Sequence, residues 1–430
     1  MPQTARRGAF ALLLTTTQLL WTTRSTAEVP PSCPSVLGRD DVVRCASHAP
    51  EVIASRQDLE VARARESSAS AYLPSRPSLS LALGRRTAAP QEPSATVWSA
   101  ELAQELEIAG QRGARRQEAS ARLRAERYRV DLLQRQTVAD ALDAYFEALA
   151  ATERKKLAEA QAEAATALAK AAKARADAGL APAIEADLAE AAAIRVGQER
   201  FAAERDLQRA LARLAALVGR DPTQPLVVEG ELVPLALPAR LEALIDRALE
   251  DRPDVAALEA EREAEEARAS LYRRQRIPNP TLSVFAEREG PDELRLGVGL
   301  AFPLPLPDPL VPNYRGEIAE ASALAAGASA KAEAIRLRAR AEVTAAARAL
   351  ASRKREAEAF SPEVIDRARR GLEALAAEVE AGRLPLRDAL LAQQSLLELL
   401  RSHLDARLEL CRASVELLRT SALSLDEVSP

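Results

Sequence analysis

Side chains that could bind a metal or attack a substrate are scarce in this sequence. It has two histidines, His48 and His403, and three cysteines, Cys33, Cys45 and Cys411. None of these residues stand together at the short spacings of metal-ligand motifs. The sequence also offers no nucleophile with a paired base and no phosphate-binding loop. We therefore predict that the protein is not an enzyme and that it holds no metal or cofactor of its own.

These residues are expected to have structural roles or to face solvent. Cys411 has leucine and valine neighbours at helical spacing, which predicts a small residue packed inside a helix interface. His403 is expected on a solvated helix face. In an exported protein Cys33 and Cys45 would close a short loop as a disulfide, and two unpaired thiols are the alternative. Cys33 follows Pro-Pro-Ser, which does not resemble a lipidation site.

Carboxylates occur at matching places beyond two breaks in the helical pattern. Glu185 stands six residues beyond the glycine of ARADAGLAPAIEADL (174–188), with Asp187 close by, and Asp388 holds the same place in VEAGRLPLRDALL (379–391). The glycine allows a left-handed turn and the proline restarts a helix, so each break predicts a tight hairpin of two helices. An acid in the first turn of a helix complements the helix dipole, and on that interpretation these carboxylates are solvated charges.

The sequence repeats itself, and the two breaks are part of the repeat. Residues 44–68 align with residues 247–271 without a gap, so that Pro50 meets Pro253 at an offset of 203 residues. Gly179 meets Gly382 at the same offset. We therefore predict two copies of one supersecondary unit.

The composition favours long helices that pack on one another. Of the 430 residues 47% are hydrophobic and 28% charged, but only 3% are aromatic, and much of the apolar share is alanine. The net charge of −4 and the lack of a basic face exclude nucleic acid as a partner. Residues 1–27 read as a secretory signal peptide, with a retained N-terminal anchor as the alternative. Beyond them no apolar stretch is long enough for a membrane-spanning helix.

Each copy has the same order of elements: a helix of about twenty residues, two short strands, a very long helix, the Gly-Pro turn and a returning helix. The predicted segments are an N-terminal segment (28–50), repeat 1 (51–218; strands 79–84 and 96–108, long helix 116–178, turn 179–182), a linker (219–253), repeat 2 (254–422; strands 281–287 and 293–303, long helix 316–381, turn 382–385) and a C-terminal tail (423–430). The fold class is mainly α with a small β part.

Four strands cannot close a barrel, and an open sheet cannot stand in lipid because its edges leave backbone groups unpaired. If the strands enter a membrane, several chains must share one barrel. Two chains would give eight strands with a filled interior, whereas three would give twelve and begin to leave a channel. The alternative is a small soluble sheet on a coiled-coil scaffold.

In its order of elements the chain resembles the TolC family of outer membrane efflux proteins. The resemblance extends from about residue 40 to residue 422. It rests on the twofold recurrence of the helix starts at Pro50 and Pro253, of the strand starts YLPSRPSL and RIPNPTL, and of the turns AGL and AGR. The alanine- and arginine-rich composition is similar to that of the heavy-metal efflux branch.

The resemblance implies a homotrimer with a twelve-stranded β-barrel in outer-membrane lipid and a helical tunnel in the periplasm. It implies a passive duct of a tripartite efflux or type I secretion system, with a periplasmic adaptor and an inner-membrane transporter, of the RND type, as partners. The adaptor would contact the two turns, and a carboxylate ring beyond them would constrict the pore and favour cations. The turn residues are Ala178, Gly179, Leu180, Ala381, Gly382 and Arg383, and the constriction candidates are Asp388, Glu185 and Asp187.

Two features depart from the family pattern. Arg383 replaces the usual small or apolar residue of the turn, and Leu391 stands where a second aspartate is expected, so the ring would be a single one. The alternative function is a periplasmic coiled-coil adaptor or scaffold without a membrane barrel. An adaptor would normally have one helical hairpin, whereas this sequence predicts two.

Overall fold

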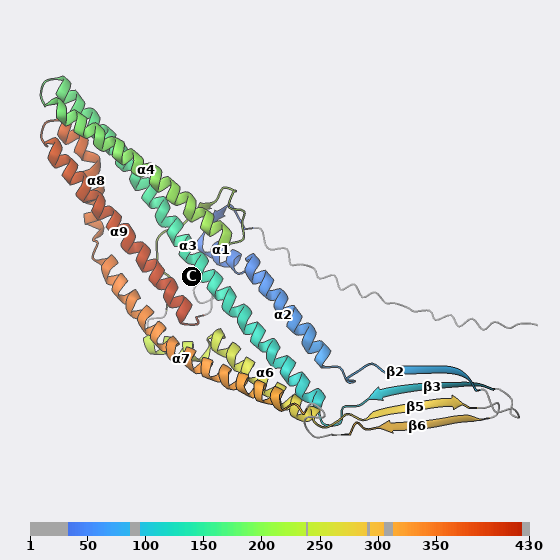
Figure 1. Ribbon diagram of the computed structural model, residues 1–430. Coiled ribbons are helices and arrows are strands. Elements are labelled where there is room, and N and C mark those ends of the chain that lie inside the picture. The colour runs from blue at the N-terminus through green and yellow to red at the C-terminus, as the bar shows by residue number, and fades with distance from the viewer. Residues whose placement is uncertain (1–32, 87–94, 238–239, 290–292, 305–312, 424–430) are drawn as a thin grey trace, which may run out of the picture. The chain divides into compact units, whose positions relative to one another are not determined.

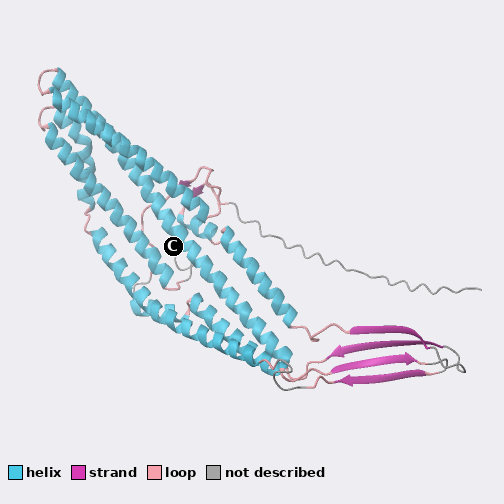
Figure 2. Ribbon diagram, in the orientation of Figure 1, coloured by secondary structure: helices cyan, strands magenta, loops and turns pink. Residues whose placement is uncertain are grey.

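The computed structural model describes residues 33–86, 95–237, 240–289, 293–304 and 313–423. The predicted signal peptide therefore lies outside the described residues. The described chain is built from long helices and one four-stranded sheet (Figure 2), which confirms the predicted fold class.

Apart from a break in the long helix of repeat 2, both repeats contain the predicted elements in the predicted order (Figure 1). Repeat 1 consists of α2 (Pro50–Ala69), β2 (Ser78–Arg86), β3 (Ala95–Glu105), α3 (Gln111–Asp177) and α4 (Ala183–Leu217). Repeat 2 consists of α6 (Pro253–Gln275), β5 (Thr281–Arg288), β6 (Leu294–Ala301), α7 (Arg315–Glu358), α8 (Pro362–Glu380) and α9 (Leu386–Thr420). Both α2 and α6 begin with a proline, which suits the first helical position because its missing N–H would have no partner there.

The second long helix, predicted as one element over residues 316–381, is two helices, and that prediction was wrong. Whereas α3 runs unbroken for 67 residues, about 100 Å at the rise of an α-helix, α7 ends at Glu358 and α8 begins at Pro362. Proline disfavours a helical conformation in the residue before it. Ser361 is accordingly extended, with φ −65° and ψ 133°, and occupies the N-cap position of α8.

Short elements that the sequence did not predict lie in the N-terminal segment and in the linker. They are β1 (Val36–Leu37), α1 (Arg39–Ala46), β4 (Val227–Val228) and α5 (Leu241–Glu250). The strands β1 and β4 form a two-stranded parallel pair. This pair joins the N-terminal segment, before repeat 1, to the linker that follows repeat 1.

The sheet has the strand order β2-β3-β5-β6, and all three neighbouring pairs are antiparallel. The hairpin of repeat 1 therefore lies beside the hairpin of repeat 2 (Figure 2). Directly after β3, the backbone N–H of Leu106 donates to the carbonyl of Pro280, directly before β5, at 2.9 Å. This hydrogen bond extends the contact between the two repeats.

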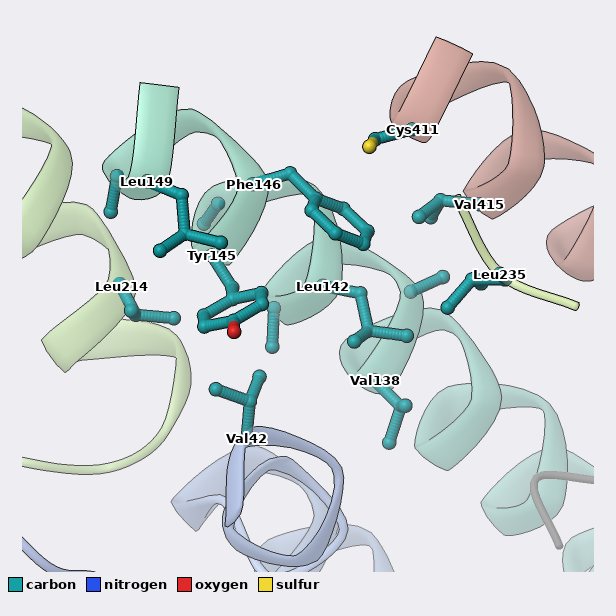
Figure 3. Packing of buried hydrophobic residues seen from close by; sticks show 14 of the residues in the cluster. Val42, Val138, Leu142, Tyr145, Phe146, Leu149, Leu214, Leu235, Cys411 and Val415 are labelled. Carbon is teal, nitrogen blue, oxygen red and sulfur yellow. The ribbon is translucent and has the colours of Figure 1, made fainter. Parts of the chain in front are cut away.

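The largest core lies where α1, α3, α4 and α9 meet the linker (Figure 3). Phe146 and Leu142 of α3 are almost fully buried there, and Cys411 of α9 is completely buried. The Tyr145 hydroxyl donates to the carbonyl of Glu229 at 2.7 Å. Burial raises the pKa of Tyr145, partly opposed by Arg39, so this hydroxyl remains a donor.

Cys33 and Cys45 are bonded as a disulfide, with their Cα atoms 5.9 Å apart. Arg220, just beyond α4, donates to the carbonyls of Cys33 and Pro34. Cys411 is free, and burial raises its pKa to about 12. Among the described residues, no helix is both long and apolar enough to cross a membrane.

We expect the number of reactive thiols to differ among three conditions. The native protein should show no reactive thiol at pH 8, because the Cys411 thiol is buried and protonated and the other two cysteines are bonded. Unfolding without reductant should expose one thiol, and unfolding with reductant all three. A thiol-reactive dye counts them, and three thiols without reductant would contradict the disulfide.

Tyr145→Phe should lower the free energy of unfolding by about 1 kcal/mol, because it removes a partly buried hydrogen bond to the Glu229 carbonyl. Thermal unfolding in detergent, followed by helical circular dichroism, measures the change. Tyr128→Phe is the control, since Tyr128 is 39% exposed. Equal effects of the two substitutions would show that the hydrogen bond between Tyr145 and Glu229 contributes nothing to stability.

Candidate functional site

The two helical hairpins end in the same backbone motif. At the turn between α3 and α4, the N–H of Gly179 donates to the carbonyl of Ala176 and the N–H of Leu180 to that of Arg175, both at 2.9 Å. Gly179 has a φ of 71°, in the left-handed region that favours glycine. This is the Schellman arrangement, which pairs carbonyls that the end of a helix leaves free.

The turn between α8 and α9 repeats the motif residue for residue. Gly382 has a φ of 70° and donates to Val379, and Arg383 donates to Glu378, both at 3.0 Å. Each following proline, Pro182 and Pro385, adopts an extended conformation and occupies the N-cap position of the next helix. The predicted hairpins are thus present, with the prolines one position before the helix rather than inside it. We call residues 178–182 tip 1 and residues 381–385 tip 2.

An arginine links the two tips within the chain. Nη1 of Arg175, in the last turn of α3, donates to the carbonyl of Val379 in α8 at 3.2 Å. The same guanidinium lies against Gly382, where an added Cβ would stand 2.6 Å from Nη1. The backbone conformation at Gly382 favours glycine, and the missing Cβ leaves room for the guanidinium of Arg175 in this position. No motif in the sequence predicts this contact.

Tip 2 also carries an ion pair of its own. The Arg383 guanidinium donates to both carboxylate oxygens of Glu378, at 2.7 and 2.8 Å. The pairing lowers the pKa of Glu378 and raises that of Arg383. The side chains of Arg383 and Glu378 are 65% and 42% exposed, so the pair orients the arginine and adds little stability. In tip 1 the equivalent residue, Leu180, is an apolar side chain that is 69% exposed.

The candidate carboxylates lie just beyond the tips. Glu185 and Asp388 are both the third residue of their helices, where the partial positive charge of the helix end favours an acid. Asp388 and Asp187 are exposed, and Glu185 is half-buried. None of the three side chains has an ion pair with another described residue. Their placement fits the dipole interpretation and leaves their charges available to a solvent-filled space.

The expectation that His403 faces solvent was wrong. Its ring packs against Phe360 at the break between α7 and α8, with the ring centroids 5.3 Å apart. Burial lowers its pKa, and the nearby Arg407 and Arg369 lower it further, so the ring is neutral at pH 7. Helical periodicity could not show this contact, because Phe360 reaches His403 only where the helix is interrupted.

The sheet has two chemically different faces. Successive side chains of a strand point to opposite faces, so the pairing register assigns each residue to one of them. One face is apolar, with its leucines and valines strongly exposed: Leu81 is 73%, Leu83 80% and Leu296 75% exposed. Trp98 lies on this face, and charge occurs only toward its ends, as at Arg288.

The opposite face of the sheet is polar. It carries serines, glycines and charged residues: Ser78, Ser80, Ser99, Glu101, Glu105, Ser283, Glu287, Arg295, Gly297 and Gly299. Apolar residues at such exposure are explained by contact with lipid, whereas a polar face requires water. Within the described part of the chain no three potential metal ligands come together.

A family model and a characterised relative both match this chain. The family model of the outer membrane efflux proteins matches residues 44–220 and 244–422, which is more than half of the chain and includes both repeats. The cobalt-zinc-cadmium resistance protein CzcC of Cupriavidus metallidurans is 29% identical over 185 residues. That match spans 43% of this chain and 44% of the relative, less than half of either.

Solved outer-membrane channels share the fold. The channel OprN is 20% identical, with a TM-score of 0.71 and 89% of each chain covered. The outer membrane protein VceC of Vibrio cholerae is 19% identical, with a TM-score of 0.70, and the alignment covers 89% of this chain and 96% of that one. The matching family model confirms the resemblance found in the sequence. The chain therefore belongs to the outer membrane efflux protein family, and its location is the outer membrane.

Proposed function

We propose that three copies of the chain close one twelve-stranded barrel and form a passive efflux duct. The observation that carries this proposal is the sheet, which combines a strongly exposed apolar face with two edge strands, β2 and β6. In lipid both edges must find a partner. Two copies would give eight strands and an interior filled by side chains, whereas three would give twelve strands and a channel.

The tips support a role as the docking end for a periplasmic adaptor, which would connect the duct to an inner-membrane transporter of the RND type. Within a trimer each tip would occur three times. Tip 1 offers the exposed Leu180, and tip 2 offers Arg383, held in place by Glu378. An adaptor would therefore meet two alternating surfaces, one apolar and one charged. Ala178, Gly179, Ala381 and Gly382 would let it approach the backbone closely.

Divalent metal cations are the cargo that we propose. The support is the relative named for cobalt, zinc and cadmium resistance, together with the carboxylates beyond the tips. Asp388 is the first candidate for a ring of three negative charges at the periplasmic end, with Glu185 and Asp187 as further candidates. Such a ring would concentrate cations without holding them, because each copy would contribute few ligands.

The assignment of the two sheet faces predicts opposite effects for neighbouring substitutions. Leu81→Lys puts a charge on the apolar face, at a cost of about 2 to 4 kcal/mol near the middle of a bilayer, so it should strongly reduce the trimer recovered from outer membranes. Ser80→Lys, one residue away on the polar face, is the matched control and should assemble like the unmodified protein. Membrane fractionation followed by electrophoresis of unheated samples measures both. A monomer in the soluble periplasmic fraction would instead favour the adaptor alternative.

Asp388→Asn should make the channel less selective for cations. The attraction between a divalent cation and one carboxylate about 4 Å away in water is about 2 kcal/mol, twice that of two unit charges, so the concentration of a divalent cation that half-blocks the current should rise roughly thirtyfold. Single-channel recording in a planar bilayer measures both selectivity and block.

Glu398→Gln is the matched control for this substitution, because it removes the same charge from an exposed position farther along α9. Glu185→Gln and Asp187→Asn rank the other two candidates. Unchanged selectivity and unchanged divalent block in Asp388→Asn would refute the assignment of Asp388 to the constriction.

A further inference from the structure

One aromatic ring lies on the polar face of the sheet. Phe285 of β5 pairs with Glu101 of β3 on one side and with Gly297 of β6 on the other, and Glu101 pairs in turn with Ser80. These four residues form one row across the sheet, and their side-chain positions share the polar face. Trp98 lies on the opposite, apolar face. Phe285 is therefore not part of a lipid-facing girdle.

The ring rests on β6, where only glycine leaves room for it. A Cβ added to Gly297 would stand 2.4 Å from Cζ of Phe285 and 2.8 Å from Cε1. An aromatic ring that covers a glycine of the neighbouring strand stabilises a sheet, so the contact has a structural value of its own. The ring is nevertheless only half-buried, and the remaining part is accessible from the polar side.

A carboxylate without a partner stands directly beside this ring. Glu101 is exposed, and no hydrogen bond or ion pair joins its side chain to another described residue. The other acids of this face are engaged: Glu287 pairs with Arg295 at 3.5 Å, and Glu105 accepts from Asn279 at 2.7 Å. Cross-strand neighbours have Cβ atoms about 4.5 to 5.5 Å apart. A single small ligand can therefore touch both the ring and the carboxylate.

We propose that Phe285 and Glu101 form a binding site for organic cations on the channel side of the barrel. The site rests on the proposed trimer, in which it would occur three times around one lumen. A quaternary ammonium ion with apolar substituents gains the attraction of the ring for a cation, the charge of Glu101 and contact with an apolar surface. A hydrated inorganic cation keeps its water and gains chiefly from the charge. The barrel would thus delay organic cations while potassium passes.

Block by tetrabutylammonium in planar bilayers, with potassium chloride as the electrolyte, tests the site. Phe285→Leu keeps an apolar side chain near Gly297 but removes the ring, and Glu101→Gln keeps the shape but removes the charge. Each substitution should raise the half-blocking concentration about fivefold and leave the potassium conductance close to that of the unmodified channel.

Trp98→Ala is the matched control, because it removes an aromatic ring from the lipid side of a neighbouring strand, and it should leave the block unchanged. Potassium-conducting channels in which Phe285→Leu and Glu101→Gln are blocked like the unmodified protein would overturn the site while leaving the duct intact. Equal weakening by Trp98→Ala would also overturn it. Unmodified protein that forms no conducting channel would overturn both the site and the duct.

Discussion

The rest of the molecule depends on the requirement that every backbone N–H and C=O find a partner once water is removed. Inside the sheet the antiparallel pairs satisfy this requirement, and at the edges, β2 and β6, it has to be met from outside the sheet. The exposed apolar face favours a position of the sheet in lipid. In lipid, the unpaired edges require strands from further chains. In the proposed trimer the polar face then becomes the wall of a channel, and each of its side chains acts three times.

The helical part meets the same backbone requirement by local means. Each tip pairs its last carbonyls through a glycine in the left-handed region, and Arg175 satisfies one further carbonyl across the two hairpins. Between the tips and the sheet, small residues allow the helices to approach closely, and the larger side chains gather in the core around Phe146. A second apolar cluster, which includes Leu168, Val379 and Leu386, packs the two hairpins together beside the tips. Stability is therefore distributed along the helices, and the polar contacts of the turns add to this packing.

Features of the fold that depend on local backbone conformation could be predicted from the sequence. Gly179 and Gly382 required particular backbone conformations, and the alternation of polar and apolar residues separated strands from helices, so the turns and the order of elements were predictable. The register of the sheet was not, because pairing between β3 and β5 joins residues nearly two hundred positions apart. For this reason Phe285 could be read as one more aromatic of the strands, although it lies on the opposite face from Trp98.

The errors have local physical causes. Pro362 indicates a helix boundary. Because the alanine-rich pattern continues on both sides of it, periodicity alone predicts one helix across the break between α7 and α8. His403 was misplaced for the same reason, since its partner, Phe360, lies in that break. The link between Arg175 and Val379 could not be found in the sequence, because nothing local distinguishes this arginine from the many others.

The interruption at Pro362 makes the two hairpins mechanically unequal. In the first hairpin, α3 is one continuous helix that leads to the tip. In the second hairpin, the helix that leads to the tip is divided into α7 and α8, which are joined by three residues. The returning helix α9 packs against both α7 and α8 and so supports the break between them. His403 of α9 contacts Phe360 at this break. Bending stress applied at the tips would therefore concentrate in one hairpin of each chain, at a known point, while the other resists as a single piece.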